Sequence, residues 1–175
     1  MFCEKCGSAF DEKKDASQNK VPDYSMKKCS NCGFEKYFNP IPVAVSMIPV
    51  LGNDGKMYLL GIKRGIQPFK GGLALPGGFQ EVNPVHQEAA IDLAQKANGL
   101  ENVYKENVLV MSSEPNPNRT LMFFESKVVL KESEIDFGFK DAKGEIEGIE
   151  LLSKDSEICF SLHKKAIDHF FKNNK

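Results

Sequence analysis

Two pairs of cysteines constrain this chain more than any other feature of its sequence. Cys3 and Cys6 are separated by two residues, as are Cys29 and Cys32, and a glycine follows each pair. This spacing lets both thiolates of a pair face one ion, and the glycine can adopt the positive φ needed to turn tightly around the sulfurs. The two pairs therefore predict a tetrahedral four-cysteine site that holds zinc as a structural cofactor.

Disulfides and redox-active cysteine pairs are the alternatives to a metal site. The N-terminus reads Met-Phe-Cys-Glu-Lys-Cys, without the basic start and apolar stretch of a signal peptide. We therefore expect a cytoplasmic protein in a reducing compartment, where disulfides are disfavoured. A redox pair usually accompanies a βαβ pattern, and none surrounds either pair. The fifth cysteine, Cys159, lies among apolar residues and is expected to be a buried small hydrophobe.

Length and composition set the domain organisation and exclude several classes of protein. The chain has 175 residues, 41% of them hydrophobic, and a net charge of -1. We expect a zinc ribbon over residues 1–38, which the metal folds, and a second domain over residues 40–175 with its own core. The net charge gives no general attraction to nucleic acid or to an anionic membrane, and no apolar run is long enough to span a bilayer. The ribbon could still bind nucleic acid or a protein, or it could serve structure alone.

Hydrophobic periodicity and turn signals predict the elements of the second domain. An Asn-Asp-Gly turn at 53–55 joins two of the strands into a hairpin, and Asn83, Pro84 and Gly99 delimit a helix. The pattern predicts an α+β, or α/β, sandwich with a mixed sheet flanked by helices, and a surface loop over 131–144. The predicted strands cover 43–50, 56–64, 73–75, 103–113, 120–130 and 145–152, and the predicted helices cover 83–99 and 161–173.

The middle of the chain resembles the Nudix hydrolase family. The resemblance is carried by Leu75-Pro76-Gly77-Gly78-Phe79, the helix that follows, and Gly99-Leu100. Flanking stretches extend it to about residues 40–171. A four-cysteine zinc ribbon ahead of a Nudix domain also resembles the arrangement in NADH pyrophosphatases. The resemblance implies a Nudix-like fold and a small-molecule ligand of the nucleoside-diphosphate type.

The chemistry of the family's signature is missing from this helix. When the signature is aligned without a gap on Gly78, its three metal-binding glutamates fall on Leu93, Lys96 and Ala97. In the family those glutamates bind Mg²⁺ or Mn²⁺ beside a diphosphate and so support the attack of water. Two unit charges about 4 Å apart interact by about 4 kcal/mol at an effective dielectric of 20, so Lys96 would repel such an ion. We therefore expect poor Mg²⁺ or Mn²⁺ binding and a pseudoenzyme.

Other residues could take over parts of the site. Glu81, Glu88 and Asp92 are candidate substitute metal ligands, although they fit a solvated helix face equally well. By position relative to the family's cleft, six residues are candidate ligand contacts, with turn formation, surface charge or core packing as the alternative for each. These six are Arg64, Gly77, Gly78, Phe79, Lys96 and Arg119.

Three hypotheses of function remain at this point. The first is a zinc-ribbon Nudix-fold protein that binds a nucleotide without hydrolysing it, as a sensor or regulator. The second is an active metal-dependent Nudix pyrophosphatase that acts on a nucleoside diphosphate derivative such as NADH or ADP-ribose. The third is a protein-interaction module in which the ribbon recruits a partner. The sequence does not determine the oligomeric state.

Overall fold

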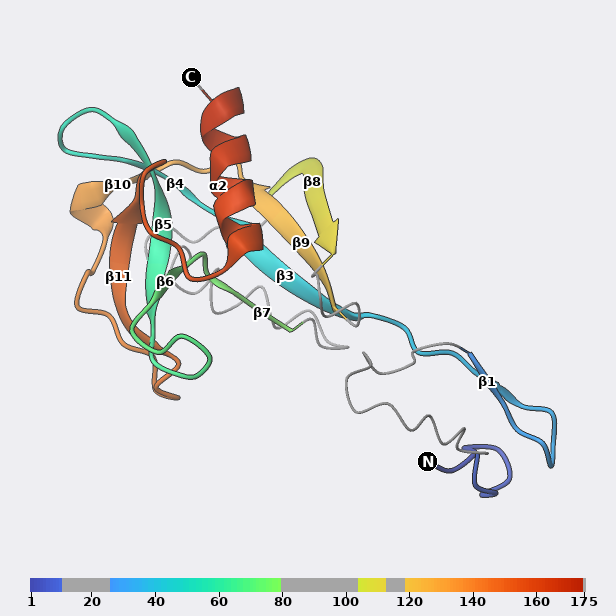
Figure 1. The fold of residues 1–175 in the computed structure, drawn as a ribbon. Helices are drawn as coiled ribbons and strands as arrows, with labels where there is room; N and C mark the ends of the chain where they lie inside the picture. The colour runs from blue at the N-terminus through green and yellow to red at the C-terminus, as the bar shows by residue number, and fades with distance from the viewer. Residues whose placement is uncertain (11–25, 80–103, 113–118, 175) are drawn as a thin grey trace. The chain divides into compact units, whose positions relative to one another are not determined.

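The computed structural model describes residues 1–10, 26–79, 104–112 and 119–174 (Figure 1). Contacts divide the chain into two compact units, Met1–Pro40 and Ile41–Lys175. The helix predicted over 83–99 lies outside the described residues. In the described part of the chain, no helix combines the length and the apolar character needed to cross a membrane.

The N-terminal unit is small and carries the four paired cysteines. Strand β1 (Lys27–Lys28) pairs antiparallel with β2 (Glu35–Lys36), and the turn between them carries the second cysteine pair. An isolated antiparallel bridge joins Phe2 to Ala9 around the first pair. Its buried apolar cluster consists of two of the cysteines and Phe10, with another cysteine and Phe34 packed against it.

The C-terminal unit contains a mixed four-stranded sheet in the order β7-β3-β9-β8. The central strands β3 and β9 run parallel, whereas β7 and β8 pair antiparallel with β3 and β9 respectively. The strand bounds are Gly77–Phe79 for β7, Ile41–Met47 for β3, Arg119–Ser126 for β9 and Tyr104–Ser112 for β8.

A second sheet has the order β10-β4-β5-β11, with β6 paired to β5. Strand β10 is parallel to β4, and the other pairs are antiparallel. The bounds are Leu130–Lys131 for β10, Pro49–Leu51 for β4, Met57–Arg64 for β5, Ile146–Leu152 for β11 and Leu73–Ala74 for β6. A 3₁₀ turn, η2 (Glu132–Glu134), follows β10.

The α+β class is confirmed, but two of the predicted strands are each divided between the two sheets. The run 43–50 lies mostly in β3 and then in β4, and the run 120–130 lies in β9 and then in β10. The sequence prediction missed the first break because the chain stays apolar across it: Met47 joins one core cluster and Ile48 joins the other. The second break follows the polar residues 125–127, which the prediction had kept within one strand.

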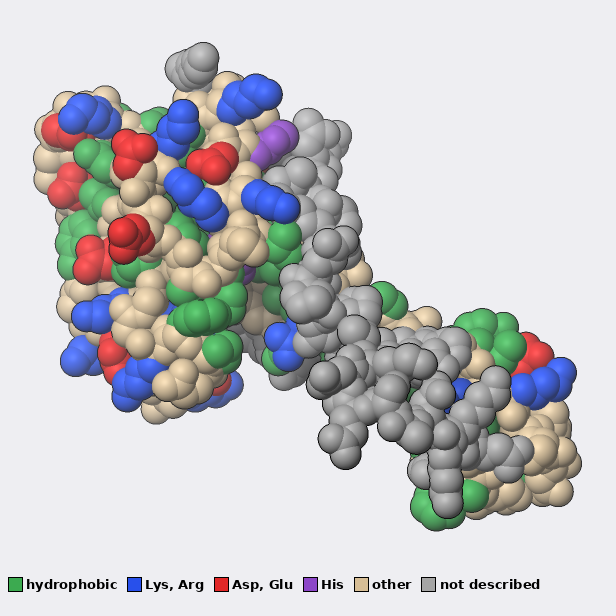
Figure 2. Space-filling model, viewed as in Figure 1, with side chains coloured by type: hydrophobic (Ala, Val, Ile, Leu, Met, Phe, Trp, Pro, Cys, Tyr) green, Lys and Arg blue, Asp and Glu red, His purple; other side chains and the backbone are tan. Residues whose placement is uncertain are grey.

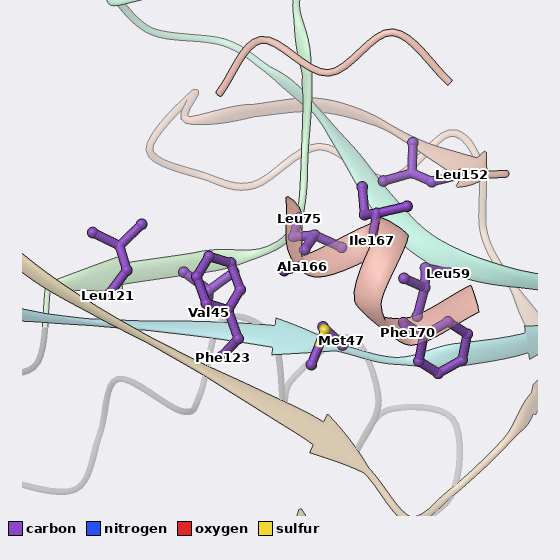
Figure 3. Packing of buried hydrophobic residues seen from close by; sticks show 10 residues of the cluster. All are labelled: Val45, Met47, Leu59, Leu75, Leu121, Phe123, Leu152, Ala166, Ile167 and Phe170. Atoms are coloured by element: carbon purple, nitrogen blue, oxygen red, sulfur yellow. The ribbon is translucent and has the colours of Figure 1, made fainter. Parts of the chain in front are cut away.

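The C-terminal helix α2 spans Ser161–Asn173, as predicted. Its buried residues Ala166, Ile167 and Phe170 recur at helical spacing and form one apolar face. Figure 3 shows this face pointing at side chains from β3, β5, β9 and β11. The cluster comprises Val45, Met47, Leu59, Leu75, Leu121, Phe123, Leu152, Ala166, Ile167 and Phe170.

A second cluster is built mainly from the other sheet. Cys159 packs against its edge and is only partly buried, less than the sequence predicted, and burial is the main cause that raises the pKa of its thiol. The buried members of the cluster are Ile48, Val50, Leu60, Ile62, Ala74, Leu130, Ile146 and Ile149. The described members of the two clusters come from both sheets and from α2.

Candidate functional site

The four paired cysteines converge in the N-terminal unit. Their sulfur atoms all lie within 4.8 Å of one another. The Sγ atoms of Cys3 and Cys32 are 3.6 Å apart, and those of Cys6 and Cys29 are 3.7 Å apart. In a tetrahedral four-sulfur site with metal–sulfur bonds of about 2.3 Å, neighbouring sulfurs lie about 3.8 Å apart. The four cysteines can therefore hold one metal ion.

The two cysteine pairs form matching backbone turns. Gly7 and Gly33 have φ values of 74° and 72°, as the glycine spacing predicted. The Gly7 amide donates to the carbonyl of Cys3 at 2.8 Å, and the Gly33 amide donates to the carbonyl of Cys29 at 2.9 Å. Each turn thus brings both of its sulfurs to the same side of the chain, which the shared site requires.

Hydrogen bonds and the neighbouring sulfurs shift the thiol pKa values of Cys6 and Cys32 in opposite directions. Bonds from the Ser8 side chain, the Ser8 backbone and Asn31 lower the pKa of the exposed Cys6 thiol to about 5. At Cys32 a backbone bond from Phe34 acts to lower the pKa, but desolvation and the adjacent thiols raise it to about 12. Four thiolates at this spacing repel one another, so their full ionisation requires a bound cation.

Asn31 connects the two turns next to the candidate metal ligands. Its Nδ2 atom lies 3.6 Å from the Cys6 sulfur and 3.0 Å from the Ser8 hydroxyl. It belongs to the second cysteine pair by sequence and hydrogen-bonds to the first. The analysis of the sequence did not single out this residue, because a polar residue between two cysteines gives no sign of which turn its side chain will contact.

The two adjacent glycines of strand β7, Gly77 and Gly78, differ in whether a larger residue would fit at their position. A Cβ atom at Gly77 would lie 2.5 Å from the carbonyl oxygen of Ala44, so close pairing with β3 already excludes a side chain there. A Cβ atom at Gly78 would meet nothing within 4 Å among the described residues. Strand packing therefore explains the first glycine, whereas a side chain at the second would meet no described residue, although Gly78 is itself only partly exposed.

Phe79 and Arg119 form a pair at one end of the four-stranded sheet. The guanidinium carbon of Arg119 lies 5.2 Å from the centre of the Phe79 ring, within the range of a cation–π contact. The two residues are 40 positions apart in the sequence and flank β3 from its two neighbouring strands. The Phe79 side chain is 50% exposed, so one large aromatic surface faces solvent beside a cation.

Arg64, another candidate ligand contact, lies at the end of β5 in the other sheet. Its guanidinium lies over the ring of Phe160, 5.0 Å from the centroid, and its Nε atom donates to the Pro68 carbonyl at 2.9 Å. These contacts join the loop after β5 to the start of α2. They assign Arg64 a role in local structure.

The remaining candidate residues lie outside the described part of the chain. They are Glu81, Glu88, Asp92, Leu93, Lys96 and Ala97.

His163 is a buried residue of helix α2 that the sequence analysis above did not single out. Its side chain is only 8% exposed, and its Nδ1 atom accepts a hydrogen bond from the Leu75 amide at 3.2 Å. The helical spacing of the sequence nevertheless indicates that His163 is buried. His163 precedes Ala166 and Ile167 by three and four residues, so it lies on the apolar face of the predicted helix.

The charges of the C-terminal unit are of both signs on the face shown in Figure 2. Lys and Arg side chains alternate there with Asp and Glu among the described residues. Ion pairs such as Lys164–Asp168 at 3.2 Å and Lys70–Glu147 at 3.3 Å neutralise part of this charge. This face therefore gives no indication of an extended electrostatic footprint for nucleic acid.

Comparison with known proteins shows which sequences this chain resembles. No protein-family model matches the chain. An ADP-ribose pyrophosphatase of Methanocaldococcus jannaschii is 36% identical over 77 residues, which make up 44% of this chain and 44% of the relative. The match therefore spans less than half the length of that curated protein.

Solved structures extend the likeness over most of the chain. A Nudix hydrolase from Nitrosomonas europaea has a TM-score of 0.56 and 19% identity, covering 99% of this chain and 91% of its own. The Nudix domain of Shewanella oneidensis NrtR, solved in complex with ADP ribose, has a TM-score of 0.56 and 12% identity, covering 78% and 89%. This chain has the Nudix fold, and its resemblance to the Nudix hydrolases is confirmed.

Proposed function

We propose that the C-terminal unit binds a nucleoside-diphosphate ligand of the ADP-ribose type and that its hydrolytic activity is impaired. The observation that carries this proposal is the Phe79–Arg119 pair, which presents an exposed aromatic ring and a cation next to Gly78, a position without a side chain and without a described residue within 4 Å of where its Cβ would lie. Among the similar solved structures, the Shewanella oneidensis NrtR domain was solved with ADP ribose bound, and a bifunctional Francisella tularensis enzyme is an ADP ribose pyrophosphatase.

The pair supplies two of the interactions that such a ligand needs. The face of the Phe79 ring can stack on a nucleobase, and the Arg119 guanidinium carries the positive charge that phosphate oxygens require. Gly78 lets a diphosphate approach the main chain without a side chain in between. The family alignment adds Lys96 as a further cation near the diphosphate, in place of a metal-binding glutamate.

Titration with ADP-ribose in the absence of divalent ions tests this binding. We expect the full chain to bind, and Phe79→Ala to weaken binding by about 5- to 150-fold, because stacking of a base on an aromatic ring contributes about 1–3 kcal/mol. Phe137→Ala is the matched control, since Phe137 is also an exposed phenylalanine of the same unit but lies in the turn after η2, away from β7 in the sequence. Equal affinities of the Phe79 and Phe137 variants would contradict the proposed site.

Impaired hydrolysis follows from the residues at the three metal-binding positions. Magnesium would contribute neutralisation of the diphosphate and activation of water, and Leu93, Lys96 and Ala97 offer it no carboxylate. We expect the combined substitution Leu93→Glu, Lys96→Glu and Ala97→Glu to create Mg²⁺ binding that the native chain lacks, measured by calorimetry. If the native chain bound Mg²⁺ as well as this variant does, the proposed impairment would be wrong.

Active hydrolysis is the second candidate, and the 36% identity to an ADP-ribose pyrophosphatase favours it. In that case Glu81, Glu88 or Asp92 would supply the carboxylates. The assay is metal-dependent release of AMP from ADP-ribose or NADH. Loss of this release in Glu81→Gln would establish the substitute ligand, whereas no release by the native chain at any Mg²⁺ or Mn²⁺ concentration would exclude the candidate.

For the N-terminal unit we propose one structural zinc ion held by Cys3, Cys6, Cys29 and Cys32. Four thiolates at tetrahedral spacing suit zinc and leave no open coordination position for catalysis. Metal analysis of the purified chain should give one zinc per chain.

The ribbon also presents Phe2 and Tyr37, which are 69% and 64% exposed. Exposed aromatic side chains of this kind would suit a protein or nucleic-acid partner, which makes an interaction module the third candidate. A short single-stranded oligonucleotide is a direct probe. Binding that is weakened by Tyr37→Ala would support this candidate for nucleic acid, and no binding would exclude that partner.

A further inference from the structure

Three described segments of the C-terminal unit pass from one sheet to the other. At each crossing, backbone amide or carbonyl groups lie outside the regular strand ladders and need other hydrogen-bond partners. At the first crossing, the Ile48 carbonyl accepts a hydrogen bond from the Leu60 amide at 2.8 Å. At the second, the Val128 amide donates to the Ser126 hydroxyl at 3.1 Å. A buried backbone group without such a partner would cost free energy, so each crossing requires its own solution.

The third crossing, between β6 and β7, depends on a distant residue. Leu75 is 1% exposed and lies after β6 ends and before β7 begins. Its amide donates to Nδ1 of His163 at 3.2 Å, across a sequence separation of 88 residues. At the other two crossings, the backbone group bonds to a neighbouring strand or to a side chain two residues away. At the third crossing, the hydrogen-bond acceptor is a side chain of the C-terminal helix α2.

The surroundings of His163 keep its imidazole neutral. The Phe123 and Phe160 rings pack against it at centroid distances of 5.5 and 5.0 Å. Burial first, and then the nearby charge of Arg64, lower its pKa to about 4. Nδ1 accepts from the Leu75 amide, so the proton of the neutral ring is on Nε2. The ring is therefore a fixed acceptor at neutral pH.

We infer that His163 is a positioning residue that sets the course of the glycine strand β7, and through it the place of Phe79. The crossing leads directly from Leu75 into this strand. The Pro76 carbonyl accepts from the Ser46 amide at 2.8 Å, and Gly77 then pairs with Val45 of β3. A loss of the bond at Leu75 would release the strand at its start, while its pairing with β3 covers only three residues.

The consequence for ligand binding rests on the function proposed above. If Gly78 and Phe79 form part of the nucleotide site, a looser β7 weakens ligand affinity although His163 itself lies in the core. The site would then depend on helix α2, which supplies none of its proposed contacts.

Two variants of the full chain test the role of His163. His163→Leu removes the acceptor and keeps an apolar side chain in the core, whereas His163→Asn can place a carbonyl oxygen near the position of Nδ1. We expect His163→Leu to speed amide hydrogen exchange of Leu75 and of β7 at least 10-fold, and to weaken ADP-ribose affinity by about 3- to 10-fold. His163→Asn should restore both to within about 3-fold of the native values, and exchange in β11 should stay native in both variants.

The two readouts separate the possible failures. Native exchange at Leu75 and β7 in His163→Leu would overturn the positioning role, and so would equal effects of the Asn and Leu variants on β7. Faster exchange in β7 with unchanged ADP-ribose affinity would overturn the link to the ligand. If the native chain does not bind ADP-ribose, the proposed function fails, and the exchange data still decide the role of His163.

Discussion

The two units of this chain reach a defined structure by different means. In residues 1–40 the described buried apolar cluster contains Cys3, Phe10 and Cys29, so two of its three members are themselves candidate metal ligands. The unit from Ile41 onward has two clusters of buried aliphatic and aromatic side chains that involve both sheets. The ribbon should therefore depend on its metal for folding, whereas the Nudix domain should depend on packing.

The two units should therefore differ in how much stability they lose when a single side chain is substituted. A metal site concentrates its stabilisation in four side chains, so the loss of one of them removes most of it. A packed core distributes its stabilisation over many side chains, and removal of one costs a few kcal/mol. Variants that act on one unit and leave the other unchanged can therefore test the comparison directly.

The largest effect is expected from removal of the proposed zinc. Chelation, or Cys29→Ser, should unfold the ribbon, because zinc contributes about 10–16 kcal/mol to the folding of small modules of this kind. The amide spectrum of the full chain should lose the β1 and β2 signals and keep those of β5 and β11.

Cys159→Ser is the control for this experiment, since Cys159 lies in the other unit and packs against its second cluster. This variant should keep the metal. A ribbon spectrum that stays native after complete removal of metal would contradict the proposed dependence.

Truncation of a core side chain should destabilise the C-terminal unit and leave the ribbon unchanged. Phe123 is fully buried in the cluster beneath α2, and Phe123→Ala should lower the free energy of unfolding of the Nudix domain by about 3–5 kcal/mol. Urea denaturation measures this loss, and zinc affinity should be unchanged. Phe137→Ala, at an exposed position, should change stability by about 0.5 kcal/mol or less. A weaker zinc site in the Phe123 variant would show that the units are not independent.

Acid should destabilise the Nudix domain through His163. Its pKa is about 4 in the folded chain and 6.5 in the unfolded reference, so the unfolded state binds the proton more readily. The stabilisation is complete above pH 6.5 and is lost progressively as the pH falls to about 4, by about 3 kcal/mol in all.

Denaturation midpoints measured at several pH values test this expectation. His163→Leu should flatten the dependence between pH 6.5 and 4, whereas His169→Gln, at an exposed position of the same helix, should preserve it. An unchanged slope in His163→Leu would assign the acid sensitivity to other groups.

The smallest effect concerns the hydrogen bond that joins the two cysteine turns. Asn31→Ala removes the contact to the Cys6 sulfur and should lower zinc affinity by about 10- to 100-fold, the usual effect of losing a partner of a metal ligand. Competition with a coloured chelator measures it. Ser30→Ala is the control, because Ser30 makes no hydrogen bond to a cysteine sulfur among the described residues. Equal affinities of the two variants would show that the bond does not support the metal site.

Much of this fold could be predicted from local pattern. The spacing of the cysteines predicted a metal cluster, and the helical spacing of apolar residues predicted α2 with its observed bounds. The Asn-Asp-Gly turn predicted the hairpin of β4 and β5, and Gly55 has the positive φ expected there. These features depend on residues close together in the sequence, whose geometry follows from their own spacing and backbone preferences.

The candidate site was less predictable. Phe79 and Arg119 were each proposed as ligand contacts, but nothing in their positions indicated that they contact each other. The acceptor for the Leu75 amide was unforeseen, because a histidine on an apolar helix face does not reveal which backbone group it will meet.

The motifs and hydrophobic pattern of the chain alone thus predicted that four cysteines come together ahead of an α+β domain resembling the Nudix hydrolases. Tertiary structure decided where the strands change sheet, which glycine of β7 has room for a side chain among the described residues, and which distant side chains contact each other. The physical reason is that these features depend on hydrogen bonds and contacts between segments 40 to 88 residues apart, and such contacts exist only after the two sheets and α2 have packed together.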